Sequence, residues 1–230
     1  MSERESANPA ILLATTRQET ALDVTAAVVN LVPLLGGPVA TILGGLSQDR
    51  KFDRVREVIL RVALELRAVQ EELGSLSKAS EEYVKSEDFQ ELLEDTLRRV
   101  SRERSGEKRR IYGGFLVDAI KSPGQAYDEQ IRFLRSLEEL QGDHIRVLRA
   151  VLLPPERNPE TIIAGSRQST LEKRLPDMSR EHVADLWHQM EGLGMLGGVS
   201  LSGIVTGSSA QDLTVALTPY GRRFTAYLSA

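Results

Sequence analysis

The sequence contains no cysteine, which excludes disulfides, thiolate zinc sites and cysteine nucleophiles. Aromatic residues make up only 5% of the chain and Trp187 is its single tryptophan, so nucleotide recognition by base stacking is not indicated. The net charge of -4 gives no global attraction to nucleic acid or anionic lipid. Residues 1–18 lack the basic region and cleavage site of a signal peptide. We interpret them as a loose leader of a cytoplasmic protein.

Motifs for catalysis are also missing. The sequence contains no H-E-x-x-H, no G-x-S-x-G and no G-x-x-x-x-G-K-[ST], and its three histidines do not cluster. One helical stripe could offer metal ligands; its members are Glu181, Asp185, His188 and Glu191. It lies opposite an apolar face that we expect to point inward, and is therefore typical of a solvated surface. The residues of the apolar face are Val183, Leu186, Trp187 and Met190. We therefore expect a non-enzymatic protein with no catalytic, cofactor-binding or metal-binding residues.

The clearest periodic pattern lies in residues 49–73. Seven apolar residues recur at alternating spacings of three and four, which is the seam of a heptad repeat; they are Phe52, Val55, Ile59, Val62, Leu66, Val69 and Leu73. Charged residues of both signs fill the other faces, so we predict one long amphipathic helix. Its seam is our candidate interaction surface. Three heptads are few for an autonomous coiled coil, which favours packing in a bundle within the chain over an intermolecular coiled coil.

An uncharged window precedes that helix. No charged residue occurs from 24 to 48, yet two Gly-Gly pairs and two prolines interrupt the window. The candidate turn consists of Pro33, Gly36, Gly37 and Pro38. It divides residues 19–46 into halves that are too short to cross a bilayer core of about 30 Å. We interpret them as an apolar hairpin buried against the heptad helix; a hairpin over 24–46 that enters a membrane is the alternative, favoured by the basic residues that follow.

The stretch from Ser77 to Ser80 breaks the apolar pattern. Further helices are predicted over residues 86–153: one capped by Ser86 and ending near 104, one over 106–121, one over 126–140 and one capped by Asp143. A helical bundle then covers residues 19–153. Within them, one run carries seven cations and only two glutamates. These cations are candidates for contact with an anionic lipid surface or RNA: Arg98, Arg99, Arg102, Arg104, Lys108, Arg109 and Arg110. The structural alternative is a solvated helix end, since basic residues at a helix C-terminus suit the helix dipole.

The stretch LLPPERNPE, residues 152–160, is the predicted domain boundary, because adjacent prolines cannot continue a helix. Residues 154–230 are then predicted to form a winged-helix-like α+β module whose first helix is 144–153. Its other elements are a helix capped by Ser179, β-like runs at 199–205 and 213–217, and a last helix with Thr218 as N-cap and Pro219 at its first position. The predicted fold class is mainly α, with an N-terminal helical bundle that contains an apolar hairpin.

Two short motifs carry a resemblance to a known fold. LWHQMEGLGML (186–196) and LTPYGRRF (217–224) resemble the recognition-helix end and the L-T-x-x-G-R signature of bacterial winged-helix regulators of the MarR and PadR kind. The positions on that signature are Leu217, Thr218, Gly221 and Arg222. The resemblance implies a fold rather than a function. The N-terminal part resembles uncharacterised bacterial helical proteins, which implies no activity.

The predicted module departs from a DNA-binding protein in its charges. From Glu181 through Tyr220 the sequence contains no lysine and no arginine, although this stretch covers most of the predicted recognition helix and the whole predicted wing. Binding to duplex DNA requires cations on the phosphates. The absence of lysine and arginine from this stretch therefore argues against nucleic acid as the partner and favours a protein-contact or dimerisation element.

Three functional hypotheses follow. The first is a non-enzymatic protein of the bacterial cytoplasm that binds a protein partner or itself as a homo-oligomer, through the heptad helix and the cation-free module. The second is a membrane-associating protein that uses the 24–46 hairpin at the inner face of the membrane. The third is a winged-helix DNA-binding regulator. None of the three implies a cofactor.

Overall fold

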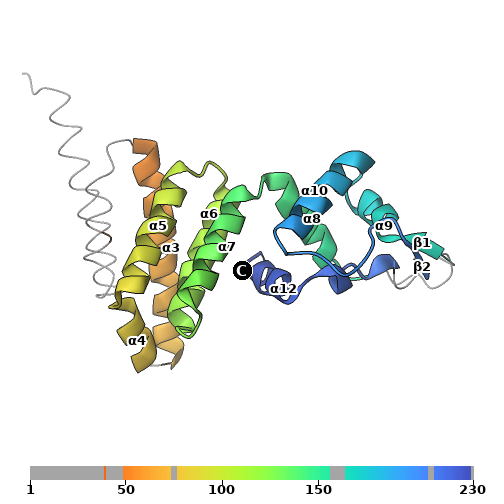
Figure 1. The fold of residues 1–230 in the computed structure, drawn as a ribbon. Coiled ribbons are helices and arrows are strands. Elements are labelled where there is room, and N and C mark those ends of the chain that lie inside the picture. Colours follow the sequence, from red (N-terminus) through yellow and green to blue (C-terminus); the bar gives the residue numbers. More distant parts are fainter. Residues whose placement is uncertain (1–38, 40–48, 74–76, 156–163, 207–209, 229–230) are drawn as a thin grey trace, which may run out of the picture. The chain divides into compact units, whose positions relative to one another are not determined.

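The computed structural model describes Val39 and residues 49–73, 77–155, 164–206 and 210–228. These residues are mainly helical, with nine α-helices and one two-stranded sheet among them (Figure 1). The chain divides into two compact units, residues 1–134 (unit 1) and 135–230 (unit 2). No described helix is both long and apolar enough to span a membrane.

The predicted leader and the turn of the predicted hairpin lie outside the described residues. This applies to residues 1–18 and to Pro33, Gly36, Gly37 and Pro38. Val39, which follows the turn directly, is described and is buried, with 1% of its surface exposed. The hairpin over 19–46 therefore remains a prediction.

Unit 1 is helical throughout its described part. Its helices are α3 (Asp49–Leu73), α4 (Lys78–Val84), α5 (Glu87–Arg102), α6 (Gly106–Lys121) and α7 (Tyr127–Glu139), of which the last continues into unit 2. Figure 1 shows α3 lying beside α5 and α6, with α4 at one end of these helices. The bounds of α3 and α6 are those predicted from the sequence.

The middle of the heptad seam of α3 lies in the core of unit 1, and the side chain of Leu73, its last member, lies outside the described residues. Val55, Ile59, Val62 and Leu66 are buried, whereas Phe52 and Val69 are half-buried. Val58 and Ala63 are also buried, so the inward face of α3 is wider than the predicted seam. The four central seam residues pack within the chain and are not exposed for contact with another molecule. This is the intramolecular alternative of the sequence analysis, and the physical reason is that α5 and α6 supply apolar partners.

Helix α4 was not predicted. The sequence analysis interpreted Ser77 to Ser80 as a break, since serine and lysine interrupt the apolar pattern there. In the structure the Ser77 side chain instead accepts a hydrogen bond from the Ser80 backbone N–H at 3.0 Å and caps α4. Serine at this position starts a helix because it satisfies a backbone donor that has no intrahelical partner.

Unit 2 combines helices with short strands. Its elements after α7 are α8 (Gly142–Leu152), β1 (Ala164–Ser166), α9 (Arg167–Arg174), α10 (Arg180–Gly192), β2 (Ile204–Thr206), the 3₁₀ helix η1 (Thr214–Ala216) and α12 (Pro219–Ala226). Strands β1 and β2 pair antiparallel with Gly165 opposite Val205. An isolated antiparallel bridge joins Leu196 and Leu217. Helix α8 packs against α9 and α10.

The division between the units falls earlier than the predicted boundary at 153/154. Pro154 and Pro155 do follow the end of α8, as the sequence suggested. Helix α8, which corresponds to the helix 144–153 that the sequence analysis assigned to the module, buries Ile145, Leu148 and Val151 within unit 2, together with α9 and α10. Proline ends a helix without separating two cores, so Pro154 and Pro155 mark the end of a helix inside unit 2.

Two predicted features of unit 2 are wrong. The predicted cap Asp143 lies in the first turn of α8, and Gln141 occupies the N-cap position. Within the predicted β run over 213–217, residues 214–216 form η1 and only Leu217 makes a β-bridge. The Asp212 carboxylate accepts hydrogen bonds from the Thr214 backbone N–H and hydroxyl and holds a tight turn.

The other predicted helix starts are confirmed. The side chains of Ser86, Ser179 and Thr218 each accept a hydrogen bond from the backbone N–H three residues later, and Pro219 occupies the first position of α12. Of the β-like run over 199–205, only its end contributes to β2. Capping residues directly before an apolar helical pattern therefore predicted the local structure more reliably than runs of β-forming residues did.

Candidate functional site

The predicted anionic contact run lies at the end of α5, in the connection to α6 and at the start of α6. Several of its cations are already paired with carboxylates. Lys108 is buried and lies 3.0 Å from the Glu103 carboxylate, and Arg109 lies 2.8 Å from Glu57 on α3. Arg98 and Arg99 pair with Glu94 and Asp95 within α5. These four cations hold the connection and the helix end in place.

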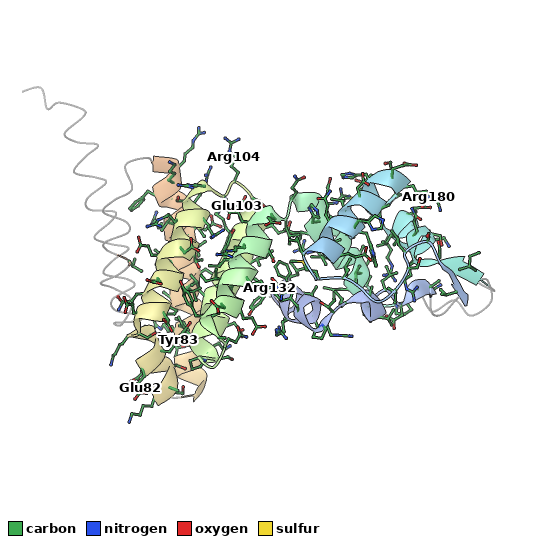
Figure 2. All side chains as sticks on the ribbon, in the orientation of Figure 1. Glu82, Tyr83, Glu103, Arg104, Arg132 and Arg180 are labelled. Carbon is green, nitrogen blue, oxygen red and sulfur yellow. The ribbon has the colours of Figure 1, made fainter. Side chains whose placement is uncertain are left out.

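The remaining three cations of the run are Arg102, Arg104 and Arg110. All three are exposed, and they make no ion pair with any residue in the described part of the chain. Figure 2 shows Arg104 at the α5–α6 connection, close to the first turns of α3. Whether a cation of this run can contact an external anion therefore depends on the carboxylates near it in the fold and not on its position in the sequence.

Helix α3 brings further cations to the same place. The Arg54 guanidinium donates a hydrogen bond to the Ser101 carbonyl at 3.1 Å, which fixes the start of α3 beside the end of α5. Arg50, one turn earlier, is exposed. We refer to the resulting cluster as the basic end of unit 1; its members are Arg50, Arg54, Arg102, Arg104 and Arg110.

The opposite end of the same helices is acidic. The Tyr127 hydroxyl donates to the Glu91 carboxylate at 3.1 Å, and the Tyr83 hydroxyl donates to the Gln130 side-chain oxygen at 2.8 Å. These bonds join the start of α7 to α5 and α4. This end also carries the exposed lysines Lys78, Lys85 and Lys121, but exposed carboxylates outnumber them. These carboxylates, which we refer to as the acidic end, are Glu81, Glu82, Glu87, Asp88, Glu91 and Asp128.

The tyrosine pKa directions agree with a negative potential at the acidic end. The pKa of Tyr127 is raised by burial, by its hydrogen bond to Glu91 and by the charges of Glu91, Asp95 and Asp88. The pKa of Tyr83 is raised chiefly by burial, and the Asp88 charge adds to it. A nearby negative charge opposes formation of the phenolate.

Helix α10 presents an acidic exposed face. Its predicted inward residues Val183, Leu186, Trp187 and Met190 are buried, as the sequence indicated. Its exposed residues include Glu181, His182, Asp185, His188 and Gln189. Arg180 at its start pairs with Glu172 at 2.8 Å. Among the described residues, no group of three histidine or carboxylate side chains is arranged to hold a metal ion.

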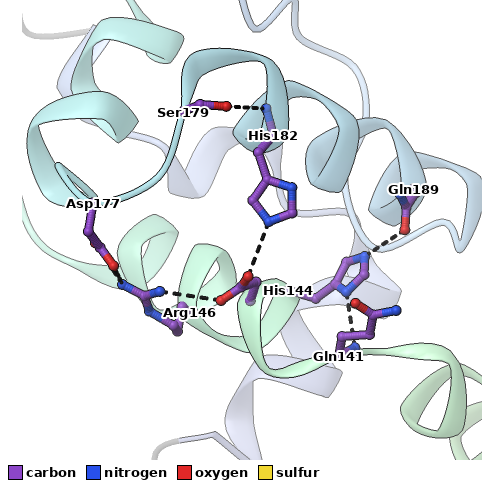
Figure 3. A network of polar contacts seen from close by, with 8 residues as sticks. Gln141, His144, Arg146, Asp177, Ser179, His182 and Gln189 are labelled. Carbon is purple, nitrogen blue, oxygen red and sulfur yellow. Dashed lines mark hydrogen bonds and ion pairs between the residues drawn. The ribbon is translucent and has the colours of Figure 1, made fainter.

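A polar network fastens α8 to α10 and to the preceding turn (Figure 3). The Arg146 guanidinium contacts both Asp177 oxygens, at 2.8 and 2.7 Å, and also reaches Asp143. The His182 ring lies 3.1 Å from the Asp143 carboxylate. The hydrogen bond from His182, followed by those from Arg146, lowers the pKa of Asp143, and Arg146 likewise lowers the pKa of Asp177. The network is structural, because its charges are satisfied by one another.

His144 makes a second connection between these helices and is buried. Its Nδ1 accepts the Gln141 backbone N–H at 3.0 Å, so the ring proton lies on Nε2. Nε2 then donates to the Gln189 side-chain oxygen at 2.9 Å (Figure 3). Both ring nitrogens are used, which assigns His144 to packing of α8 on α10 rather than to chemistry.

The signature residues of the C-terminal motif also have structural roles. The Thr218 hydroxyl donates to the Gly194 carbonyl at 2.6 Å, and its backbone N–H donates to the Met195 carbonyl at 3.1 Å. The Gly221 backbone lies so close to Met195 that a Cβ at position 221 would collide with the Met195 carbonyl. The threonine and the glycine therefore dock the start of α12 on the turn after α10.

A few large apolar side chains are exposed in both units. Ile204 on β2 is 82% exposed, and Leu64 on α3 is 60% exposed. Val215 and Leu153 are about half exposed in unit 2. The sequence analysis did not single out Ile204, because exposure of one residue in a three-residue strand has no periodic signature.

No protein-family model matches the sequence, and neither a curated protein nor a solved structure matches the chain. The function is therefore inferred from the residues of the two units. Two features stand out as accessible: the basic end of unit 1, and the cation-free stretch of unit 2 with its exposed isoleucine.

Proposed function

We propose that the chain is a non-enzymatic interaction protein whose unit 2 makes the protein contact, with a second copy of this chain as the partner. In this proposal unit 1 is a helical bundle completed by the apolar hairpin over 19–46. Unit 2 is a winged-helix-like module, which the order helix, strand, helix, helix, strand and final helix supports. The pairing of β1 with β2 supports it further.

The observation that carries the proposal is the surface of β2. Ile204 is the most exposed large apolar residue among those described, and β2 pairs with β1 along one edge only within the described sheet. Folded proteins commonly protect such edges with lysine or proline. Here the stretch from Glu181 to Tyr220, which contains β2, lacks lysine and arginine, so β2 itself presents no cation to a second β2.

The charge of α10 argues against duplex DNA as the partner. Its exposed face carries Glu181 and Asp185, and its first cation, Arg180, is paired with Glu172. Phosphates would be repelled where a recognition helix must approach them. No described residue of α10 therefore supports the hypothesis of a DNA-binding regulator.

Sedimentation velocity over a range of concentrations tests the proposal on the full chain. We expect the wild type to self-associate and Ile204→Asp to weaken the association about tenfold or more, which corresponds to roughly 1.4 kcal/mol. Leu64→Asp is the matched control, because it introduces the same charge at a comparably exposed leucine of unit 1. A wild type that stays monomeric throughout, or an equal loss in the Leu64 variant, would contradict the proposal.

A further inference from the structure

The fold gathers cations that are remote in the sequence. Residues 50–57 of α3 and residues 98–110 of α5 and α6 together contain eleven lysines and arginines and only four carboxylates. The bond from Arg54 to the Ser101 carbonyl and the ion pair of Arg109 with Glu57 hold the two segments together. The basic end is therefore a built feature of unit 1 and not a chance run on one helix.

The cations at this end fall into two groups. Lys108 and Arg109 are paired with carboxylates and shape the α5–α6 connection. Arg102, Arg104 and Arg110 project as exposed side chains without a described ion pair. The second group retains its charge for an external anion, because no carboxylate in the described part of the chain neutralises it.

Unit 1 is polarised along α5. The acidic end begins at Glu87 and the basic end lies at Arg102, so the 16 residues of α5 separate them by about 24 Å. That separation is roughly three Debye lengths at physiological salt, where the Debye length is about 8 Å. When the basic end touches an anionic surface, the carboxylates of the acidic end are screened from it. The net negative charge of the chain therefore does not prevent binding.

A lipid surface fits this arrangement better than nucleic acid does. The segment that leads into Arg50 is the uncharged window from 24 to 48, so apolar sequence joins unit 1 where its cations gather. Apolar residues next to basic ones are the pattern of proteins that bind anionic bilayers. Surfaces that bind single-stranded nucleic acid instead combine cations with aromatic stacking residues, and this chain is only 5% aromatic.

We infer that the basic end of unit 1 binds the anionic phosphate headgroups of a lipid bilayer, with Arg102, Arg104 and Arg110 as the principal contacts. The contact is separate from the self-association proposed for unit 2 and does not depend on it. Each lysine or arginine near an anionic membrane surface strengthens binding by about fivefold. Loss of the three arginines should therefore weaken binding by roughly a hundredfold.

Vesicle co-sedimentation of the full chain tests the inference. The vesicles are phosphatidylcholine alone, or phosphatidylcholine with about 30 mol% phosphatidylglycerol to supply the negative surface potential. The test variant is the triple Arg102→Gln, Arg104→Gln and Arg110→Gln. The matched control is the triple Lys78→Gln, Lys85→Gln and Lys121→Gln, which removes the same charge from exposed lysines elsewhere in unit 1. Thermal unfolding by circular dichroism establishes that both variants are folded.

We expect the wild type and the lysine control to bind anionic vesicles similarly, and the arginine triple to bind roughly a hundredfold more weakly. Equal binding to neutral vesicles, or equal losses in the two triples, would overturn the inference. Competition by millimolar inorganic phosphate would assign the arginines to a small-anion site and would also overturn it. Tighter binding to duplex DNA or RNA of the same charge density would replace lipid with nucleic acid. None of these outcomes bears on the Ile204 test.

Discussion

Unit 1 and unit 2 arrange their charges in different ways. Unit 1 separates them, so that one end of its helices is basic and the other acidic. Unit 2 pairs many of its charges locally, as in the network of Asp143, Arg146 and Asp177, and leaves the stretch from Glu181 to Tyr220 without cations. The chain thus offers an electrostatic surface in one unit and a weakly charged surface with an exposed isoleucine in the other.

The difference between the units shows that a surface charge cluster can come either from one contiguous stretch of sequence or from segments that the fold brings together. The cation-free stretch of unit 2 is contiguous, so the sequence alone displays it. The basic end of unit 1 is assembled from segments that Arg54 and Ser101 join across 47 positions. About half of the basic run proved to be paired with nearby carboxylates. A count of charges along a sequence therefore overstates the available surface, and only the fold identifies the exposed members.

The largest expected effect tests whether the two units have separate cores. Val62→Asp places a carboxylate in the core of unit 1 and should destabilise that unit by about 4 kcal/mol or more. Trp187 is the single tryptophan and is fully buried in unit 2, so its fluorescence reports unit 2 alone. We expect far-ultraviolet circular dichroism to show loss of helix while the Trp187 signal keeps its unfolding midpoint.

Leu64→Asp provides the control for this variant on the same helix. Leu64 is exposed, so its substitution should change the free energy of unfolding by no more than about 0.5 kcal/mol. Equal destabilisation by the two variants would mean that the inward face of α3 is misassigned. Loss of the Trp187 signal in Val62→Asp would mean that the units do not fold separately.

The next effect concerns unit 2. Gly221→Ala forces a methyl group against the Met195 carbonyl and should destabilise unit 2 by about 3 kcal/mol, measured by urea unfolding followed at Trp187. Gly192→Ala, in α10, meets no atom within 4 Å and should be neutral or slightly stabilising. If the two variants unfold alike, the close approach of α12 to the turn after α10 does not exist in solution.

The smallest effect is a pH dependence within unit 2. The folded-state pKa values of Asp143 and Asp177 are lowered, so the unfolded chain binds more protons than the folded chain as the pH falls. Their stabilisation is present above the ordinary aspartate pKa of 3.8 and is lost as the pH falls through the lowered folded values. Solvent screening keeps the contribution small because Asp177 is exposed and Asp143 is about half exposed.

Asp143→Asn should reveal this dependence. Urea unfolding followed at Trp187 should show the variant less stable than the wild type at neutral pH. The difference should vanish at a pH below both folded values, where Asp143 is protonated in the wild type. A difference that is the same at all pH values would show that the carboxylate charge does not fasten α8 to α10.

Much of the local structure could be predicted from the sequence. The bounds of α3 followed from an apolar repeat held over three heptads, and the starts of α5, α10 and α12 followed from a serine or threonine before apolar periodicity. These signals act within one or two helical turns. They depend on a residue's nearest neighbours in the chain, and tertiary packing did not override them.

The rest depended on contacts that a linear pattern does not contain. Residues 213–217 have β-forming side chains, but the Asp212 carboxylate draws them into η1. The boundary between the units falls within α7 and depends on which helices share a core, whereas the place of the 144–153 helix in the C-terminal module was predicted. The basic end and the network around Asp143 join residues tens of positions apart, and no spacing rule connects them.

Hydrogen–deuterium exchange of the full chain, with and without anionic vesicles, tests the central claim most directly. The account predicts slower exchange of backbone amides at the start of α3 and in the α5–α6 connection when phosphatidylglycerol vesicles are present. It predicts no change in α10 and β2. Protection confined to residues 180–206, with residues 98–110 unchanged, would contradict the assignment of the anionic contact to unit 1.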